Sequence, residues 1–194
     1  MKINDYYTDV GPIVLKDDLA EFLGFPEDGI VKIYYPEIVK IAGHSCATVA
    51  GAYMMAYAGI KKLYGNDMPK RGEIKVEMRD RQEDGSNGVS ATVFSNITGA
   101  TADYGFAGLG GNYSRRNLLF FQAPINAFVR FTRKDTNESV EVNYRPAEVV
   151  HPSNIMMTAI GPKATDESRK AFPKKWQDMV KTLFENIDKV IDVV

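Results

Sequence analysis

Cysteine is the residue that this sequence most clearly lacks, because Cys46 is the only one among 194 residues. A single thiol excludes an internal disulfide framework and any zinc finger that needs paired cysteines. The chain also has no apolar run of the ~18 residues needed to span a membrane. No signal peptide is visible at Met1–Asp5, so we expect a cytoplasmic protein, although a removed leader would leave the same start.

An excess of charge of one sign is also missing. The chain has 24 basic and 25 acidic residues, with a formal net charge of -1. A nucleic-acid surface normally shows a basic excess, so we expect no nucleic acid and no membrane among the partners. The short basic stretch Arg115-Arg116 is interpreted as solvated surface. A composition of 44% hydrophobic and 25% charged residues is typical of one globular domain, here covering residues 1–194.

The first part of the chain is predicted to be helical. Residues 1–42 place apolar side chains at helical spacing, namely Leu15, Leu19, Phe22 and Leu23. A second short helix is expected around Pro36–Ile41. Ala47–Leu63 follows, rich in alanine and glycine and apolar nearly all round, which predicts a helix in the interior that ends at Gly65.

A strand-rich part follows, and it makes the expected fold α+β. Strands are predicted by alternating or β-rich runs at 73–79, Val89–Ile97, Asn117–Gln122, Asn126–Arg133 and Ser139–Tyr144. The loop Lys134–Asn137 is expected to join the last two runs as a hairpin. We expect a mixed or antiparallel sheet packed on the small-residue helix, with helices at both ends of the chain. A C-terminal helical extension of about 153–194 is predicted, with Pro173 at a first helical position. Its apolar stripe packs either on this domain or on a second copy of the chain; it consists of Trp176, Val180, Leu183, Phe184, Ile187 and Ile191.

The sharpest chemical feature is Gly43-His44-Ser45-Cys46, directly before the buried helix. A thiol at a helix N-terminus faces unpaired N–H groups and the positive dipole end, which favour thiolate. The imidazole of His44, two residues earlier, could share a metal with Cys46, and this ligand pair suits zinc and similar transition metals. The structural alternative is an inert buried cysteine beside a capping histidine. The other histidine, His151, precedes Pro152 in an expected surface linker.

The second feature is a glycine-dense loop, Thr98–Asn112, with four glycines between Gly105 and Gly111. Glycine lets backbone amides approach a ligand closely, so Gly110 and Gly111 are candidate ligand-binding residues. The polar members that could point into a site are Asp103, Tyr104 and Asn112. The spacing matches neither a Walker loop nor a dinucleotide fingerprint, and an elaborate turn is the alternative.

Together these features resemble the FmdE-like family, which is named after a component of formylmethanofuran dehydrogenase. The family carries Gly-His-x-Cys-Pro-Gly at the start of a long small-residue helix, then Thr-Gly-Cys-Thr, then a glycine-rich turn that ends Gly-Asn-Leu. Here the corresponding segments are Gly43–Thr48, Thr98–Thr101 and Gly110–Asn112, and the resemblance covers about 38–145. The chain departs from the family pattern at Ala47 and Thr48, which replace Pro-Gly, and at Ala100, which replaces the second cysteine. After Asn112 the leucine of the pattern, Leu118, is reached only after an insertion. The cysteine-rich C-terminal zinc module of some members is missing.

The resemblance implies an α+β core, often in an intertwined homodimer, with a metal-capable pocket near His44 and Cys46. Water and an oxygen donor such as Asp103 would complete the ligands, and Thr98–Asn112 would form a wall of the same pocket. The expected function is therefore metal binding, with zinc as the expected ion, and whether the protein is an enzyme stays open. An enzymatic version would use the metal as a Lewis acid, or to activate water, on a small polar substrate. The alternatives are a non-catalytic carrier of a metal or small ligand, and a metal-free enzyme in which His44 activates Cys46 as nucleophile.

Overall fold

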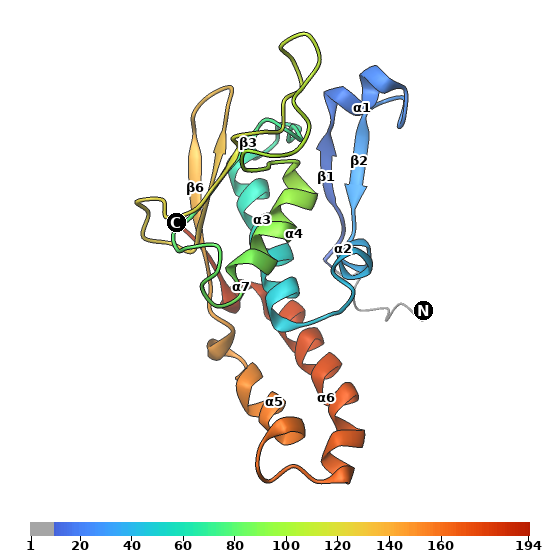
Figure 1. The fold of residues 1–194 in the computed structure, drawn as a ribbon, viewed down its shortest axis with the longest axis vertical. Coiled ribbons are helices and arrows are strands. Elements are labelled where there is room, and N and C mark those ends of the chain that lie inside the picture. Colours follow the sequence, from blue (N-terminus) through green and yellow to red (C-terminus); the bar gives the residue numbers. More distant parts are fainter. Residues whose placement is uncertain (1–9) are drawn as a thin grey trace.

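The computed structural model describes residues 10–194, so the first nine residues of the predicted helical region 1–42 lie outside the described part. Residues 10–194 form seven α-helices, a five-stranded mixed sheet and a two-stranded antiparallel sheet, which confirms the predicted α+β class (Figure 1). None of the helices in this part of the chain is long and apolar enough to cross a membrane.

In chain order the elements are β1 (Ile13–Lys16), α1 (Asp18–Leu23), β2 (Ile30–Ile33), α2 (Tyr35–Ala42), α3 (Ala47–Tyr64), β3 (Ile74–Met78), α4 (Asn87–Thr98), β4 (Leu119–Phe120), β5 (Val129–Arg133), β6 (Ser139–Tyr144), a 3-10 turn (Pro146–Glu148), α5 (Pro152–Ile160), α6 (Asp166–Glu185), α7 (Ile187–Val190) and β7 (Ile191–Val193). The larger sheet has the order β4-β3-β5-β6-β7, and only the β3–β4 pair among its neighbours is parallel.

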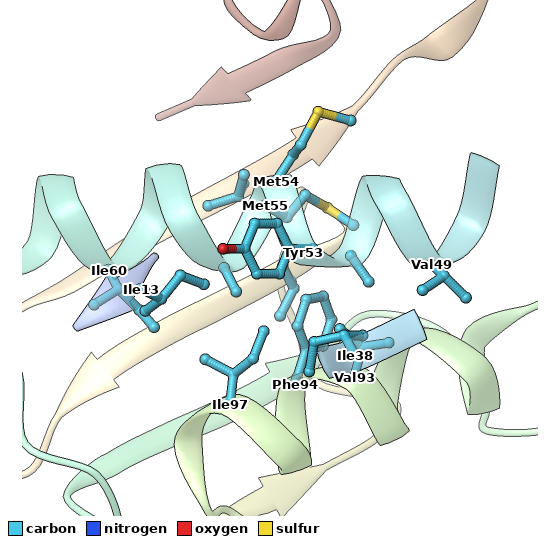
Figure 2. Close-up of a cluster of buried hydrophobic side chains, with 14 of the residues drawn as sticks. Ile13, Ile38, Val49, Tyr53, Met54, Met55, Ile60, Val93, Phe94 and Ile97 are labelled. Carbon is cyan, nitrogen blue, oxygen red and sulfur yellow. The ribbon is translucent and has the colours of Figure 1, made fainter. Parts of the chain in front are cut away.

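Helix α3 is the centre of the core, as its composition predicts. Thirteen of its 18 residues are buried, and Gly65 caps its C-terminal end. Gly59 lies against Phe131 and Val142 of the sheet, so that a Cβ there would sit 2.8 Å from the phenyl ring. Figure 2 shows side chains of α3 and α4 meeting in one apolar cluster, among them Tyr53, Met55 and Phe94. Small residues thus allow the close approach between helix and sheet that buries this surface.

The helices α3 and α4 form the middle layer of the molecule. The five-stranded sheet lies on one side of them, and the β1–β2 hairpin with α2 lies on the other (Figure 1). On β3, Ile74, Val76 and Met78 are buried while the residues between them are partly exposed, as the predicted alternation requires. The predicted hairpin between β5 and β6 is confirmed, because Val129 to Thr132 pair antiparallel with Val142 to Ser139.

The prediction of helix over residues 1–42 is wrong for the described part before α2. Ile13–Lys16 and Ile30–Ile33 pair as an antiparallel hairpin, and only the six residues of α1 between them are helical. Leu15 is fully buried in β1, whereas Phe22 and Leu23 are more than 60% exposed on α1. The apolar residues that suggested one face of a helix therefore include a buried strand residue, Leu15, and two exposed helical residues, Phe22 and Leu23. The expected helix around Pro36–Ile41 is confirmed as α2, with Pro36 in its first turn.

The predicted strand Val89–Ile97 is also wrong, because this segment forms α4. Its buried residues include Ser90, Ala91, Phe94 and Ile97, which follow a helical spacing, while Val89 is 38% exposed. A short segment with several β-branched residues satisfies both periods, and packing against α3 decides for the helix. The sequence between 117 and 122 contributes only the two-residue strand β4.

The C-terminal helices form a hairpin that extends from the body of the molecule (Figure 1). Pro173 lies inside α6, which begins at Asp166 with Thr165 as N-cap, so its predicted place at a helix start is wrong. The extended linker predicted around His151 does not continue past this residue, because α5 begins at Pro152. His151 itself is exposed, as predicted. The apolar stripe packs within this chain, with Val180, Leu183 and Phe184 buried in the core.

Candidate functional site

Cys46 is the N-cap residue of α3. Its backbone is extended, and its Sγ accepts a hydrogen bond of 3.4 Å from the backbone N–H of Val49. The thiol is free and partly exposed. The sulfur therefore lies at the positive end of an 18-residue helix, as the sequence predicts. The alternative interpretation placed this cysteine in a buried position, whereas Cys46 is partly exposed.

His44 is exposed in the turn between α2 and α3, and one of its ring nitrogens is held by a hydrogen bond to the backbone. Its Nδ1 lies 3.0 Å from the carbonyl oxygen of Ala42. A carbonyl oxygen can only accept, so Nδ1 carries the hydrogen in this contact and Nε2 of the neutral ring keeps its lone pair. Histidines that bind metals usually have this arrangement, in which a backbone carbonyl orients the ring from behind.

The turn that carries His44 and Cys46 is held by the C-terminal helix. The carbonyl oxygen of Ser45 accepts hydrogen bonds from Trp176 Nε1 at 3.1 Å and from Gln177 Nε2 at 3.3 Å. The Ser45 hydroxyl lies 3.0 Å from the hydroxyl of Tyr35 at the start of α2. Two candidate ligands on a short turn are thus held by helices α2 and α6, so their position depends on residues more than 130 apart in sequence.

Tyr144 of β6 is the titratable neighbour of Cys46. Its hydroxyl donates a 3.0 Å hydrogen bond to the carbonyl oxygen of Ala47, in the first turn of α3. Burial, together with the nearby Cys46, raises the pKa of Tyr144 well above its ordinary value. The ring packs directly against Gly51, where a Cβ would lie 2.3 Å from it. Tyr144 is therefore a neutral hydrogen-bond donor at this end of α3, and glycine is required beneath it.

This chain contributes two candidate metal ligands at the site. Among residues 10–194 no group of three or more histidine, cysteine, aspartate or glutamate side chains is close enough together to hold a metal ion. Asp103 therefore does not complete a site with His44 and Cys46 within one chain. Within residues 10–194, no histidine, cysteine, aspartate or glutamate side chain adds a third ligand at this site.

The glycine-dense loop lies at the opposite end of the helical layer from Cys46. The Thr48 hydroxyl is 3.4 Å from that of Ser86, so α3 and α4 begin side by side. The loop starts where α4 ends, twelve residues later, which corresponds to about 18 Å of helix. Figure 1 shows the loop at the far end of both helices. The predicted shared pocket is therefore wrong within a single chain.

The loop residues themselves have separate roles. Asp103 and Tyr104 are exposed. Gly110 and Gly111 both have positive φ, 55° and 84°, at a tight turn closed by paired hydrogen bonds between Leu109 and Asn112. This geometry agrees with the turn interpretation of the glycines. Asn112 lines a polar cavity of about 160 Å³ near α1.

Two arginines that line the same cavity, Arg71 and Arg115, share a buried carboxylate, and the sequence did not predict this cluster. Asp17 is 4% exposed and accepts hydrogen bonds from Arg71 Nη1 at 2.9 Å and Arg115 Nη2 at 2.6 Å. Burial alone would raise the pKa of Asp17, but the hydrogen bond from Arg71 and the charge of Arg115 outweigh it and lower that pKa. Arg115 is only 7% exposed, so the interpretation of Arg115-Arg116 as solvated surface is wrong for Arg115. No local pattern signals a pair 98 residues apart.

In comparisons with known proteins, no family model matches this chain and no curated protein matches it.

Proposed function

We propose that the protein binds a transition metal ion, with zinc as the expected ion, through His44 Nε2 and Cys46 Sγ. The observation that carries the proposal is the contact between His44 Nδ1 and the Ala42 carbonyl oxygen, at 3.0 Å. It leaves Nε2 as the metal-binding nitrogen on an exposed ring. The position of Cys46 at the N-terminus of α3 supports the same proposal, because helix dipoles favour a negatively charged ligand there.

The remaining ligands are proposed to come from a second copy of the chain or from water. Two ligands per chain do not hold zinc in the usual four-coordinate geometry, and two copies would supply two imidazoles and two thiolates. The C-terminal apolar stripe, which the sequence left open to a second copy, is mostly buried within one chain, at Val180, Leu183, Phe184 and Ile191. Ile41 is 63% exposed at the end of α2, close in sequence to His44, and it supports an interface at this end of the molecule.

With a metal bound, the site would supply Lewis-acid chemistry on a small polar substrate. His44 and Cys46 would bind the metal ion, and the carbonyl oxygen of Ser45 would hold their turn against α6. Tyr144 would remain protonated beside Cys46. A carrier would use the same two ligands without catalysis. The metal-free alternative, with Cys46 as a nucleophile and His44 as its base, needs the same accessible thiol, and metal content separates it from the other two.

The test is metal analysis of the purified protein after equilibration with zinc and removal of unbound ion. We expect at most about one ion per chain, and about half an ion per chain if two copies share it. Cys46→Ser should remove most of the metal, because its hydroxyl can still cap α3 but is a poor zinc ligand. His44→Ala should also lose metal. The matched controls are His151→Ala, the other histidine, and Thr48→Ala in the first turn of α3, and both should keep it.

Two outcomes would contradict the proposal. Unchanged metal content in Cys46→Ser would show that the thiol is not a ligand, and metal loss in His151→Ala equal to that in His44→Ala would show unspecific binding. Light scattering of the zinc-loaded protein at micromolar concentration tests the assembly. A monomeric mass with bound metal would reject the contribution of a second copy and leave water as the remaining ligand.

A further inference from the structure

The polar cavity near α1 is lined by the less exposed side chains of Arg71 and Arg115, which form its inner wall, and by the more exposed Asp18 and Glu73 at its mouth. Its volume is about 160 Å³, below that of most pockets for drug-sized ligands, so it suits a small ligand or a single head group. The charged side chains that line it are Arg71, Arg115, Asp18 and Glu73, and the neutral ones include Asn112 and Tyr113. The cavity is far from Cys46, beyond the C-terminal end of α4, and does not depend on the proposed metal site.

The two arginines are held in place before any ligand arrives. Arg71 donates from Nη1 to Asp17, from Nε to the carbonyl oxygen of Ile97 and from Nη2 to that of Asn96. Arg115 donates from Nη2 to Asp17 and lies against Gly72, where a Cβ would meet its Nη1 at 1.5 Å. Glycine at position 72 therefore makes the space that the guanidinium fills. Such immobilised donors lose little entropy when they bind a ligand.

Arg115 has donors that no described residue uses. Its guanidinium has five N–H groups, and among residues 10–194 its hydrogen-bond acceptor is Asp17. No buried side-chain nitrogen or oxygen in this part of the chain lacks a hydrogen-bond partner. Nε and Nη1 of Arg115 must therefore be in contact with solvent, although the side chain is only 8% exposed. The cavity that Arg115 lines is the place where solvent, or a ligand oxygen, can reach them.

The charges around the cavity decide what kind of anion fits. Asp17, behind the wall, neutralises one of the two arginines. At the mouth, Glu73 pairs with Lys134 at 2.8 Å, and Asp18 lies 3.9 Å from Lys70. Four cations, Arg71, Arg115, Lys70 and Lys134, thus surround three carboxylates, an excess of one positive charge. A singly charged oxyanion balances this excess, whereas the two carboxylates at the mouth disfavour an anion with two charges.

We infer that this cavity binds the carboxylate group of a small organic acid. Arg115, together with Arg71, forms the binding wall, because guanidinium groups match the planar carboxylate. Asn112 and Tyr113 also line the cavity, and both carry side-chain hydrogen-bond donors. The glycine-dense loop then has a ligand-binding role at this cavity.

The experiment is titration of the full-length protein with sodium propionate, and separately with sodium phosphate, at constant ionic strength. Binding is followed by calorimetry and by the Nε–H resonances of arginine in ¹H–¹⁵N spectra. Propionate should bind with a dissociation constant in the millimolar range or below, shift an arginine Nε–H resonance that is missing in Arg115→Lys, and bind more tightly than phosphate. Arg115→Lys should weaken binding at least about tenfold, because a lysine lacks the planar set of donors.

Glu73→Gln provides a test that does not depend on a buried residue. Removal of one negative charge at the mouth should tighten propionate binding about threefold to fivefold, as expected for a charge several ångströms away near a protein surface. The matched control is Glu148→Gln, an exposed carboxylate on the 3-10 turn at the other end of the sheet, which should leave the affinity unchanged. The inference is overturned if propionate does not bind, if phosphate binds more tightly, or if Glu73→Gln leaves propionate binding unchanged or weaker.

Discussion

Replacement of Asp17 by alanine removes the carboxylate that Arg71 and Arg115 share. Asp17 accepts two side-chain hydrogen bonds, and its Oδ1 also caps α1 by accepting from the backbone N–H groups of Leu19 and Ala20. Loss of an N-cap costs about 1 kcal/mol. Loss of one partner of a buried ion pair costs about 3–5 kcal/mol, because the other charge stays buried without compensation. Arg115 is in that position, whereas Arg71 is partly exposed.

We therefore expect Asp17→Ala to lower the free energy of unfolding by about 3–5 kcal/mol, since the two losses overlap in one side chain. The assay is urea unfolding at pH 7, followed by circular dichroism. The matched control is Asp67→Ala. Asp67 is 66% exposed, and its partner Arg133 keeps a second carboxylate, Asp135, so that the cost should stay below about 1 kcal/mol. A loss of less than about 1 kcal/mol in Asp17→Ala would refute the reasoning that Arg115, buried without its carboxylate, destabilises the fold.

Two further predictions concern acid stability and packing. The folded-state pKa of Asp17 is below its ordinary value of 3.8, so the ionised form contributes stability that is present above that value and is lost as the pH falls through the folded pKa. Thermal unfolding should therefore show a melting temperature that falls below about pH 4, and Asp17→Asn should make this fall shallower. An unchanged dependence of the melting temperature on pH in Asp17→Asn would contradict the assignment. Gly51→Ala should lower the free energy of unfolding by about 1–3 kcal/mol, because its Cβ would lie within 2.7 Å of three ring atoms of Tyr144. The control, in the same urea unfolding assay, is Gly88→Ala in α4. A Cβ there would lie 3.4 Å from its nearest neighbour, so this substitution should be neutral or stabilising. Equal effects at the two positions would count against the close approach of Tyr144.

The amino-acid sequence determined the features that depend on local pattern. Composition and periodicity predicted the α+β class, the buried helix from Ala47, strand β3 and the β5–β6 hairpin, because each pattern spans one element and its turn. The position of Cys46 at the start of α3 was predicted for the same reason: an N-cap depends on its own residue and the few that follow. The ring orientation of His44 was not predicted, since it depends on a backbone contact within the turn.

Tertiary structure alone decided the features that depend on distant residues. Val89–Ile97 satisfied both a strand and a helix pattern, and packing on α3 selected the helix. The same packing places the glycine-dense loop at the far end of α3 from Cys46, because α3 and α4 run in the same direction. Arg115 is buried only because the fold brings Asp17 to it across 98 residues, with glycine at position 72 leaving room for its guanidinium. Charge pairing at that separation has no local signature, since only the packed chain determines which water is removed and which partner replaces it.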